Sequence, residues 1–97
     1  MSIENWKVSE LEDKTYYNEA YEYEIKDSHY FARLKRRNGF WNITLWHKAS
    51  AKLNLRPEFE DAFVEPDVNK AKETAEKRIK AWLTRKINTL QSLLDSL

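Results

Sequence analysis

The pair Asn38-Gly39 limits the fold more than any other feature, because Gly39 is the only glycine in the chain. Asn-Gly between alternating apolar runs is the strongest short-range signal for a β-hairpin, since a type I′ turn needs positive φ at both central residues. A two-residue loop at this point sets Leu34 opposite Ile43. A slip of one residue would move every apolar side chain to the other face, so the alternation supports this register.

The predicted hairpin has one apolar face and one basic-aromatic face. The apolar face consists of Tyr30, Ala32, Leu34, Trp41, Ile43 and Leu45, with Arg36 and His47 at its ends. The opposite face consists of Phe31, Arg33, Lys35, Arg37, Phe40, Asn42, Thr44 and Trp46. An antiparallel sheet commonly packs one face on the core and leaves the other solvated, so we expect the apolar face to lie under another element.

A preceding strand fits the same register if Asp27-Ser28 forms a second two-residue turn. Tyr21, Tyr23 and Ile25 then join the apolar face, and Glu22 and Glu24 fall on the opposite one. Three strands that agree in parity predict a three-stranded antiparallel meander over residues 19–47.

Pro66 and Asp67 predict the start of a long helix, with Asp67 as its N-cap. Apolar residues recur from there at helical spacing, as Val68, Ala71, Ala75, Ile79 and Trp82, and then as Leu83, Ile87, Leu90, Leu94 and Leu97. No Gly or Pro interrupts residues 67–97. A helix of that length runs about 45 Å, whereas strands of about nine residues span about 30 Å. The last turns are therefore expected to overhang the sheet or to follow a break near residues 84–89.

The predicted fold class is α+β, a three-stranded antiparallel meander packed by a long C-terminal helix in one domain over residues 1–97. Residues 19–47 form the sheet, 48–66 a connection with at most one short strand, and 67–97 the helix. Residues 1–18 form either a short helix or an extra strand. Cysteine is absent and no apolar run approaches the ~20 residues of a membrane span. With no secretory signal at its start, the chain is expected to be cytoplasmic.

Charge is strongly segregated along the chain although the net charge is only +1. Residues 31–56 carry seven bases and no acid, and residues 57–67 carry five acids and no base. Such segregation builds local fields that favour charged partners. With one glycine and no cysteine, the sequence has neither a Gly-rich phosphate loop nor a thiol nucleophile. His29 and His47 fall on opposite faces in the predicted register, so the chain is expected to be non-enzymatic, with no cofactor or metal.

Two segments are predicted to bind a protein partner. The first is the C-terminal stripe Leu83, Ile87, Leu90 and Leu94, whose overhanging part would need a second copy of the chain or another protein to cover it. The second is the acidic connection, residues 58–66, in which acids alternate with Phe59 and Phe63 before Pro66. The competing interpretations are a stripe packed on the protein's own core and a solvated loop whose two Phe side chains are buried.

The basic-aromatic face is an alternative site, for nucleic acid. Bases that stand between aromatic side chains can neutralise phosphates while the rings stack on nucleobases; on this face they are Arg33, Lys35 and Arg37 between Phe31, Phe40 and Trp46. The competing interpretation is a solvated sheet face on which Glu22 pairs with Arg33.

In whole-chain character, the sequence is similar to the small accessory proteins of lambdoid phages, which are short, highly charged and rich in aromatic residues without cysteine. Among them it most resembles the anti-RecBCD accessory proteins. That resemblance implies a nuclease inhibitor that binds the host RecBCD helicase–nuclease, protects phage DNA ends and alters DNA recombination. It also implies that Glu65-Pro66 could recruit a host prolyl isomerase. Separately, the run NKAKETAE at residues 69–76 resembles the start of the last helix in double-stranded RNA-binding domains.

Overall fold

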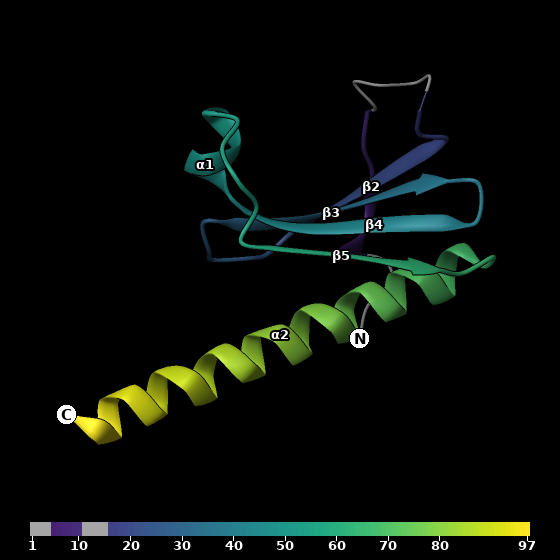
Figure 1. Cartoon of the computed structure of the whole chain (residues 1–97). Coiled ribbons are helices and arrows are strands. Elements are labelled where there is room, and N and C mark those ends of the chain that lie inside the picture. Colours follow the sequence, from purple (N-terminus) through teal and green to yellow (C-terminus); the bar gives the residue numbers. More distant parts are fainter. Residues whose placement is uncertain (1–4, 11–15) are drawn as a thin grey trace.

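The computed structural model describes residues 5–10 and 16–97. They form an α+β fold in which a long helix crosses one face of a five-stranded antiparallel sheet of order β1-β2-β3-β4-β5 (Figure 1). The elements are β1 (Lys7–Val8), β2 (Glu19–Glu24), β3 (Tyr30–Arg37), β4 (Phe40–His47), α1 (Lys48–Lys52), β5 (Phe59–Val64) and α2 (Val68–Ser96). Each strand pairs with the next along the chain, so the whole sheet is a meander.

The predicted register of the central strands is confirmed. Leu34 lies opposite Ile43, and Tyr23 lies opposite Ala32. The predicted type I′ turn is wrong, because Asn38 has a φ of 54° but Gly39 does not have a positive φ. The observed register therefore does not depend on a type I′ turn.

The predicted number of strands is wrong, since β1 and β5 extend the three-stranded meander on both sides. Within the connection, α1 follows β4 directly, and β5 then pairs along β4. Phe59 and Phe63 alternate along β5 on the face that α2 covers, opposite Leu45 and Trp41. Asp61 lies between them on the same face, so the usual apolar alternation of a strand was broken in the sequence.

The core lies between α2 and the apolar sheet face, as predicted. Leu34, Trp41 and Ile43 are the largest fully buried side chains. Ala71 and Ala75 are also fully buried, and their small side chains let the helix approach the sheet closely. Trp6 lies in the N-terminal segment for which the sequence allowed either a short helix or an extra strand. It joins this core, and its Nε1 donates a hydrogen bond of 3.3 Å to Glu76 Oε1.

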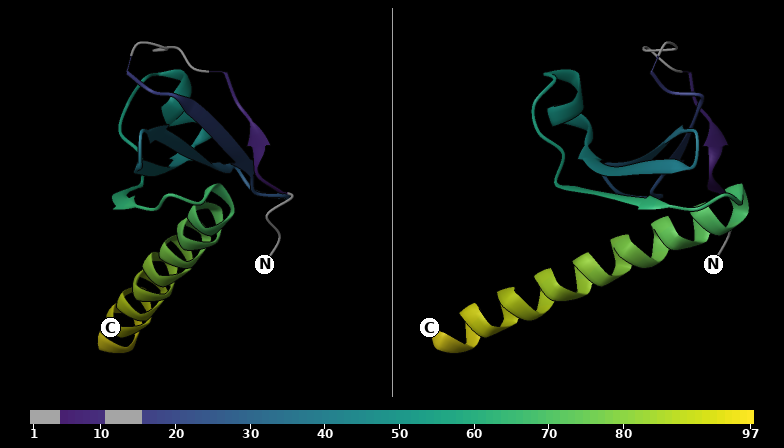
Figure 2. Two further views of the ribbon diagram at one scale, coloured as in Figure 1. Left: turned by 90° about the vertical axis from the view of Figure 1, so that its right-hand side faces the viewer. Right: turned by 45° about the vertical axis from the view of Figure 1, so that its right-hand side comes forward.

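Asp67 caps α2 as predicted, since its side chain accepts a hydrogen bond of 3.0 Å from the Lys70 backbone N–H. The helix then continues without a break from Val68 to Ser96. Of the two outcomes expected for its last turns, the structure therefore shows the overhang: α2 runs past the end of the sheet and diverges from it (Figures 1 and 2).

Asp61 ties the outer edge of the sheet to α2. Its carboxylate accepts a hydrogen bond of 2.5 Å from the Arg78 guanidinium and one of 2.9 Å from the Ala62 backbone N–H. The Arg78 hydrogen bond lowers the pKa of Asp61, an effect that partial burial opposes and the Ala62 N–H reinforces. The ionised carboxylate is therefore part of the contact between β5 and the helix.

We expect this contact to contribute to acid sensitivity. A carboxyl whose pKa is lowered by folding stabilises the protein above its unfolded pKa, and that stability is lost as the pH falls toward the folded pKa. Asp61→Asn should therefore lose less stability than wild type between pH 5 and pH 2, as urea unfolding would measure. The difference should not exceed about 1 kcal/mol, because the pair is partly exposed. Glu60→Gln removes the same charge from the neighbouring position, and an equal change in both variants would contradict a specific role for Asp61.

Candidate protein-binding surface

The last four turns of α2 form a projecting arm, residues 83–97, whose apolar side chains are exposed. Ile87, Leu90, Leu93 and Leu94 are each 59–65% exposed. The apolar stripe of the arm consists of Leu83, Ile87, Leu90, Leu94 and Leu97, at steps that keep one face of a helix. Leu93 is exposed as well, but it lies beside this stripe rather than in it, so the helical spacing of the stripe did not predict it.

The stripe continues the face that packs on the sheet. Ile79, one turn before Leu83, is 7% exposed and belongs to the core, whereas Leu83 is 39% exposed. The same apolar face thus passes from buried to exposed where the helix diverges from the sheet, and the arm leaves the body of the molecule (Figure 2). The molecule is accordingly elongated, with extents of 49, 29 and 22 Å.

An apolar hollow of about 420 Å³ lies at the base of the arm. Its apolar lining comes from the sheet and from the helix: Ile25, Tyr30, Leu45, Trp82, Leu83 and Leu90. Trp82 is held in place by Phe59 of β5, with ring centroids 5.5 Å apart. A second hollow of about 170 Å³ shares Ile25 and Leu83 with the first, so apolar space flanks Leu83 on both sides.

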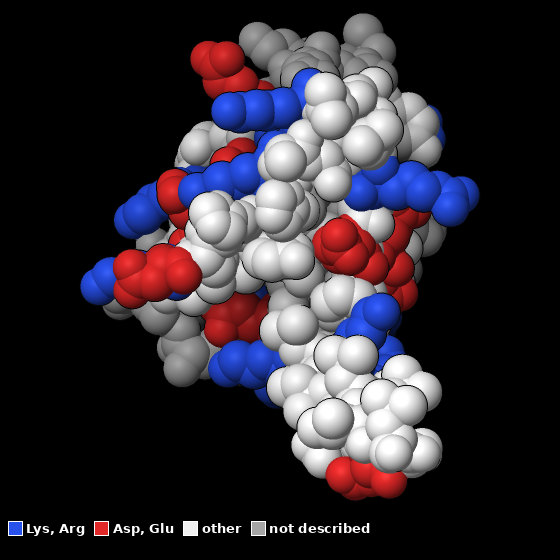
Figure 3. Space-filling view, turned by 90° about the vertical axis from the view of Figure 1, so that its left-hand side faces the viewer, with Lys and Arg blue, Asp and Glu red and all other residues white. Residues whose placement is uncertain are grey.

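Charge is unevenly distributed along this part of α2. Residues 77–86 carry five bases and no acid, while Asp95 is the only ionisable side chain in residues 87–97. Figure 3 shows the result on one face: the projecting end is mostly uncharged there, with acid at its tip and bases where it joins the body.

The acidic connection does not form one surface with the stripe. Phe63 is 9% exposed and packs in the core under the Arg78 guanidinium, so it is a core side chain and not an exposed anchor. Phe59 lies at the base of the arm, against Trp82. Pro66 is exposed at the opposite end of β5, just before α2 begins, and the described residues contain no cis peptide bond.

The basic-aromatic face lies on the side of the sheet away from α2, as predicted, but its cations already have partners. Arg33 forms an ion pair of 3.3 Å with Glu22, while Lys35 and Arg37 lie over the rings of Tyr17 and Tyr16. The predicted cross-strand pair Glu22–Arg33 is therefore present. Of the aromatic residues on this face, Phe40 is 65% exposed, Trp46 is half-buried, and Phe31 is buried at 9% exposure, which leaves little of its ring for stacking.

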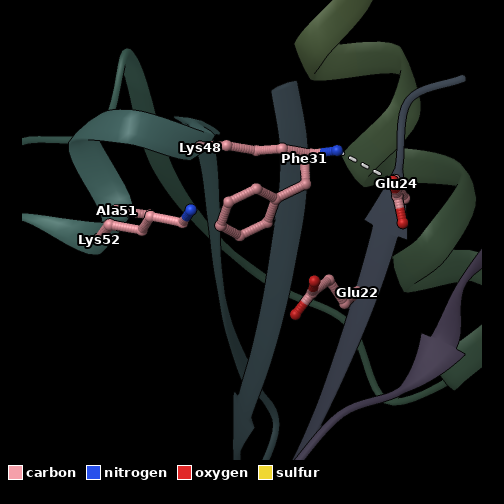
Figure 4. Close-up of a pocket in the computed structure, with 6 residues that line it drawn as sticks. All are labelled: Glu22, Glu24, Phe31, Lys48, Ala51 and Lys52. Carbon is pink, nitrogen blue, oxygen red and sulfur yellow. Dashed lines mark hydrogen bonds and ion pairs between the residues drawn. The ribbon is translucent and has the colours of Figure 1, made fainter. Parts of the chain in front are cut away.

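A hollow of about 380 Å³ beside Phe31 mixes both signs of charge (Figure 4). Glu22 and Glu24 line it from β2, and Lys48 and Lys52 line it from α1. Lys48 Nζ forms an ion pair of 2.9 Å with Glu24. Two carboxylates in the same hollow weaken the electrostatic attraction that a phosphate backbone would need.

His29 and His47 lie close together, with ring centroids 5.9 Å apart, so the expectation that they fall on separate faces is wrong. The turn before β3 brings His29 alongside the end of β4, where the Lys48 backbone N–H donates to the His29 carbonyl. His47 Nδ1 accepts from the Ala49 backbone N–H and caps α1. In residues 5–10 and 16–97, no cluster of three or more His, Cys, Asp or Glu side chains could hold a metal.

Comparison with protein-family models, curated proteins and solved structures finds no match to this chain. The features of this chain that bear on its function are therefore the arm, its hollow and its charges. Although α2 is long, no helix of the described residues is both long and apolar enough to cross a membrane.

Proposed function

We propose that this protein is a non-enzymatic binding protein that holds another protein through the apolar stripe of its arm. The observation that carries the proposal is the abrupt exposure of the stripe beyond Ile79, where the helix diverges from the sheet and the apolar pattern continues. Burying a Leu or Ile side chain on association is worth about 1.5–3 kcal/mol, so several such residues in one row can drive binding. An amphipathic helix with anchors at this spacing fits an apolar groove or another helix.

The whole-chain similarity to anti-RecBCD accessory proteins makes the host RecBCD helicase–nuclease the first partner to test. In this proposal the protein acts in the cytoplasm by binding alone. Phage DNA ends survive and recombination changes because the nuclease is occupied. A host prolyl isomerase that acts at exposed Pro66 is a further partner in the same proposal.

The double variant Leu90→Asp with Leu94→Asp tests the stripe. It places two charges in a contact that must be desolvated, so capture of RecBCD should fall by more than tenfold. Both side chains are largely exposed, so the free energy of unfolding should change by no more than about 1 kcal/mol. Affinity for the purified complex and thermal unfolding are the measurements.

The matched control for this test is Asn88→Asp with Ser92→Asp, which adds the same two charges at the same spacing on the opposite side of the helix. It should bind as wild type does. Unchanged capture by the stripe variant would place the binding surface elsewhere, whereas its unfolding would show that the stripe is part of the core.

Nucleic-acid binding by the basic-aromatic face is the second candidate function. The row of cations at Arg33, Lys35 and Arg37 supports it, and Glu22 beside Arg33 argues against it. A salt titration separates the two candidates. Phosphate contacts would make affinity for DNA or RNA fall steeply with salt, whereas a protein-binding function predicts little nucleic-acid binding at any salt concentration.

A further inference from the structure

We infer that the stripe pairs with the stripe of a second copy of this chain, with the two arms antiparallel. The inference rests on the proposed function, because it names the first occupant of the same surface. Besides the exposed stripe, two features of the molecule support this pairing: the uneven charge of α2 and the apolar hollow at the base of the arm.

The charge pattern favours the antiparallel orientation. Side by side in parallel, two copies would bring the basic stretches at residues 77–86 together, with Lys80 and Lys86 next to the contact. Antiparallel arms instead bring the tip that carries Asp95 to the basic stretch of the other copy. At 100° per residue, Lys80 and Asp95 lie on the same flank of the stripe, and like flanks face each other in an antiparallel helix pair. The arrangement therefore brings Asp95 of each copy toward Lys80 of the other, on the same side of the contact.

The same alignment also sets the apolar residues of one stripe against those of the other. Leu83 of one copy meets Leu94 of the other, and Ile87 meets Leu90, in a contact that a two-fold axis repeats. Leu97 then reaches the level of Lys80 on the second copy. Each stripe residue from Leu83 onward thus gains an apolar neighbour or lies over the base of the opposite arm.

The hollow at the base of the arm receives the tip of the second copy. Trp82 and Lys86, which lie on one flank of the stripe, are among the residues of α2 that line it. Leu93 lies on that flank too, and the antiparallel alignment sets Leu93 of the second copy beside Lys86. Side chains from the tip would therefore enter the 420 Å³ space between the helix and the sheet, next to Tyr30. The alignment thus accounts for the exposure of Leu93 as well as that of the stripe.

The pairing should be weak and reversible. The arm is a helix of roughly 22 Å. Two helices of that length bury less than the ~800 Å² per partner that a standard stable interface buries. We expect a dissociation constant in the micromolar range. A host protein that binds the stripe must then displace the second copy, so capture per molecule should fall as the protein concentration rises.

Sedimentation of the full chain across a concentration series tests self-association. Wild type and the control Asn88→Asp with Ser92→Asp should shift from monomer to dimer over the micromolar range, whereas Leu90→Asp with Leu94→Asp should remain monomeric. Orientation is tested with spin labels on single-cysteine variants, Thr89→Cys and Ser96→Cys, because the chain has no cysteine of its own. In an antiparallel pair, the labels at 89 lie near the midpoint and those at 96 are offset along the axis by about 20 Å.

Each outcome decides between the two ideas. A dimer that the stripe variant abolishes, with a longer distance at 96 than at 89, supports the inference. Equal distances at both positions, or a dimer that survives in the stripe variant, overturn it. A wild-type monomer at every concentration overturns it as well, yet leaves the proposed function in place if the stripe variant still loses RecBCD. If the stripe variant is monomeric yet captures RecBCD as wild type does, the proposed function fails while the pairing of the arms stands.

Discussion

Trp41→Ala is expected to lower the free energy of unfolding by about 3–5 kcal/mol. The Trp41 side chain is 1% exposed and packs at the centre of the core against Tyr21, with ring centroids 6.3 Å apart. Its Nε1 donates a hydrogen bond of 2.7 Å to the Glu65 carbonyl, at the point where the chain turns from β5 into α2. Truncation therefore leaves a large cavity and removes the hydrogen-bond donor of that carbonyl.

Phe40→Ala is the matched control, since Phe40 precedes Trp41 in the same strand and points to the opposite face. It is 65% exposed, so its truncation should cost no more than about 1 kcal/mol. Urea unfolding followed by circular dichroism measures both variants without depending on tryptophan fluorescence. Similar losses at the two positions would mean that the two faces of β4 are assigned the wrong way round.

Ala75→Asp is expected to be at least as damaging, at about 4 kcal/mol or more. Ala75 is fully buried where α2 packs on the sheet, so the new carboxylate would lose its hydration without gaining a partner. A loss of this size is a large part of the 5–15 kcal/mol that stabilises a typical domain. The thermal midpoint should fall by more than about 15 °C, since each kcal/mol shifts it by roughly 4–8 °C in a domain of up to 100 residues.

Ala81→Asp makes the same chemical change on the exposed side of the same helix. It carries only the loss of helix propensity, about 0.7 kcal/mol, which both variants share. The difference between the two midpoints therefore isolates burial from propensity. Equal midpoints would show that α2 does not pack on the sheet through Ala75.

Much of the fold could be predicted because the central strands keep a strict alternation. A slip of one residue would mix the two faces, and the two-residue loop at Asn38-Gly39 sets Leu34 opposite Ile43, so the turn type was not needed to find the register. The position of β5 was not predicted because Asp61 places an acid on the side of the strand that faces the core. In the structure, Arg78 of α2 neutralises that acid. The position of Trp6 in the core was not predicted because the strand that follows it, β1, has only two residues and so shows no alternation of apolar and polar side chains.

In the candidate site, too, some features follow from local spacing and others depend on contacts between distant parts of the chain. Phe63 and Leu90 are both apolar side chains at regular spacing, yet one is a core residue and the other is exposed. Sequence spacing predicts which residues share a face, but it does not show how far the covering element reaches. Phe31 illustrates the reverse case, a side chain on the predicted solvent face that is nevertheless buried.

By itself, the sequence determined the two faces of the sheet, the N-cap at Asp67 and the unbroken apolar stripe of the helix, because each depends only on local spacing and local hydrogen bonds. The tertiary structure decided where that stripe becomes exposed. From Leu83 onward the helix diverges from the sheet and continues to Ser96, and Ile25, Leu45 and Trp82 meet there from three distant parts of the chain to form the hollow. Such a surface depends on the relative lengths and crossing direction of packed elements, which no single segment encodes.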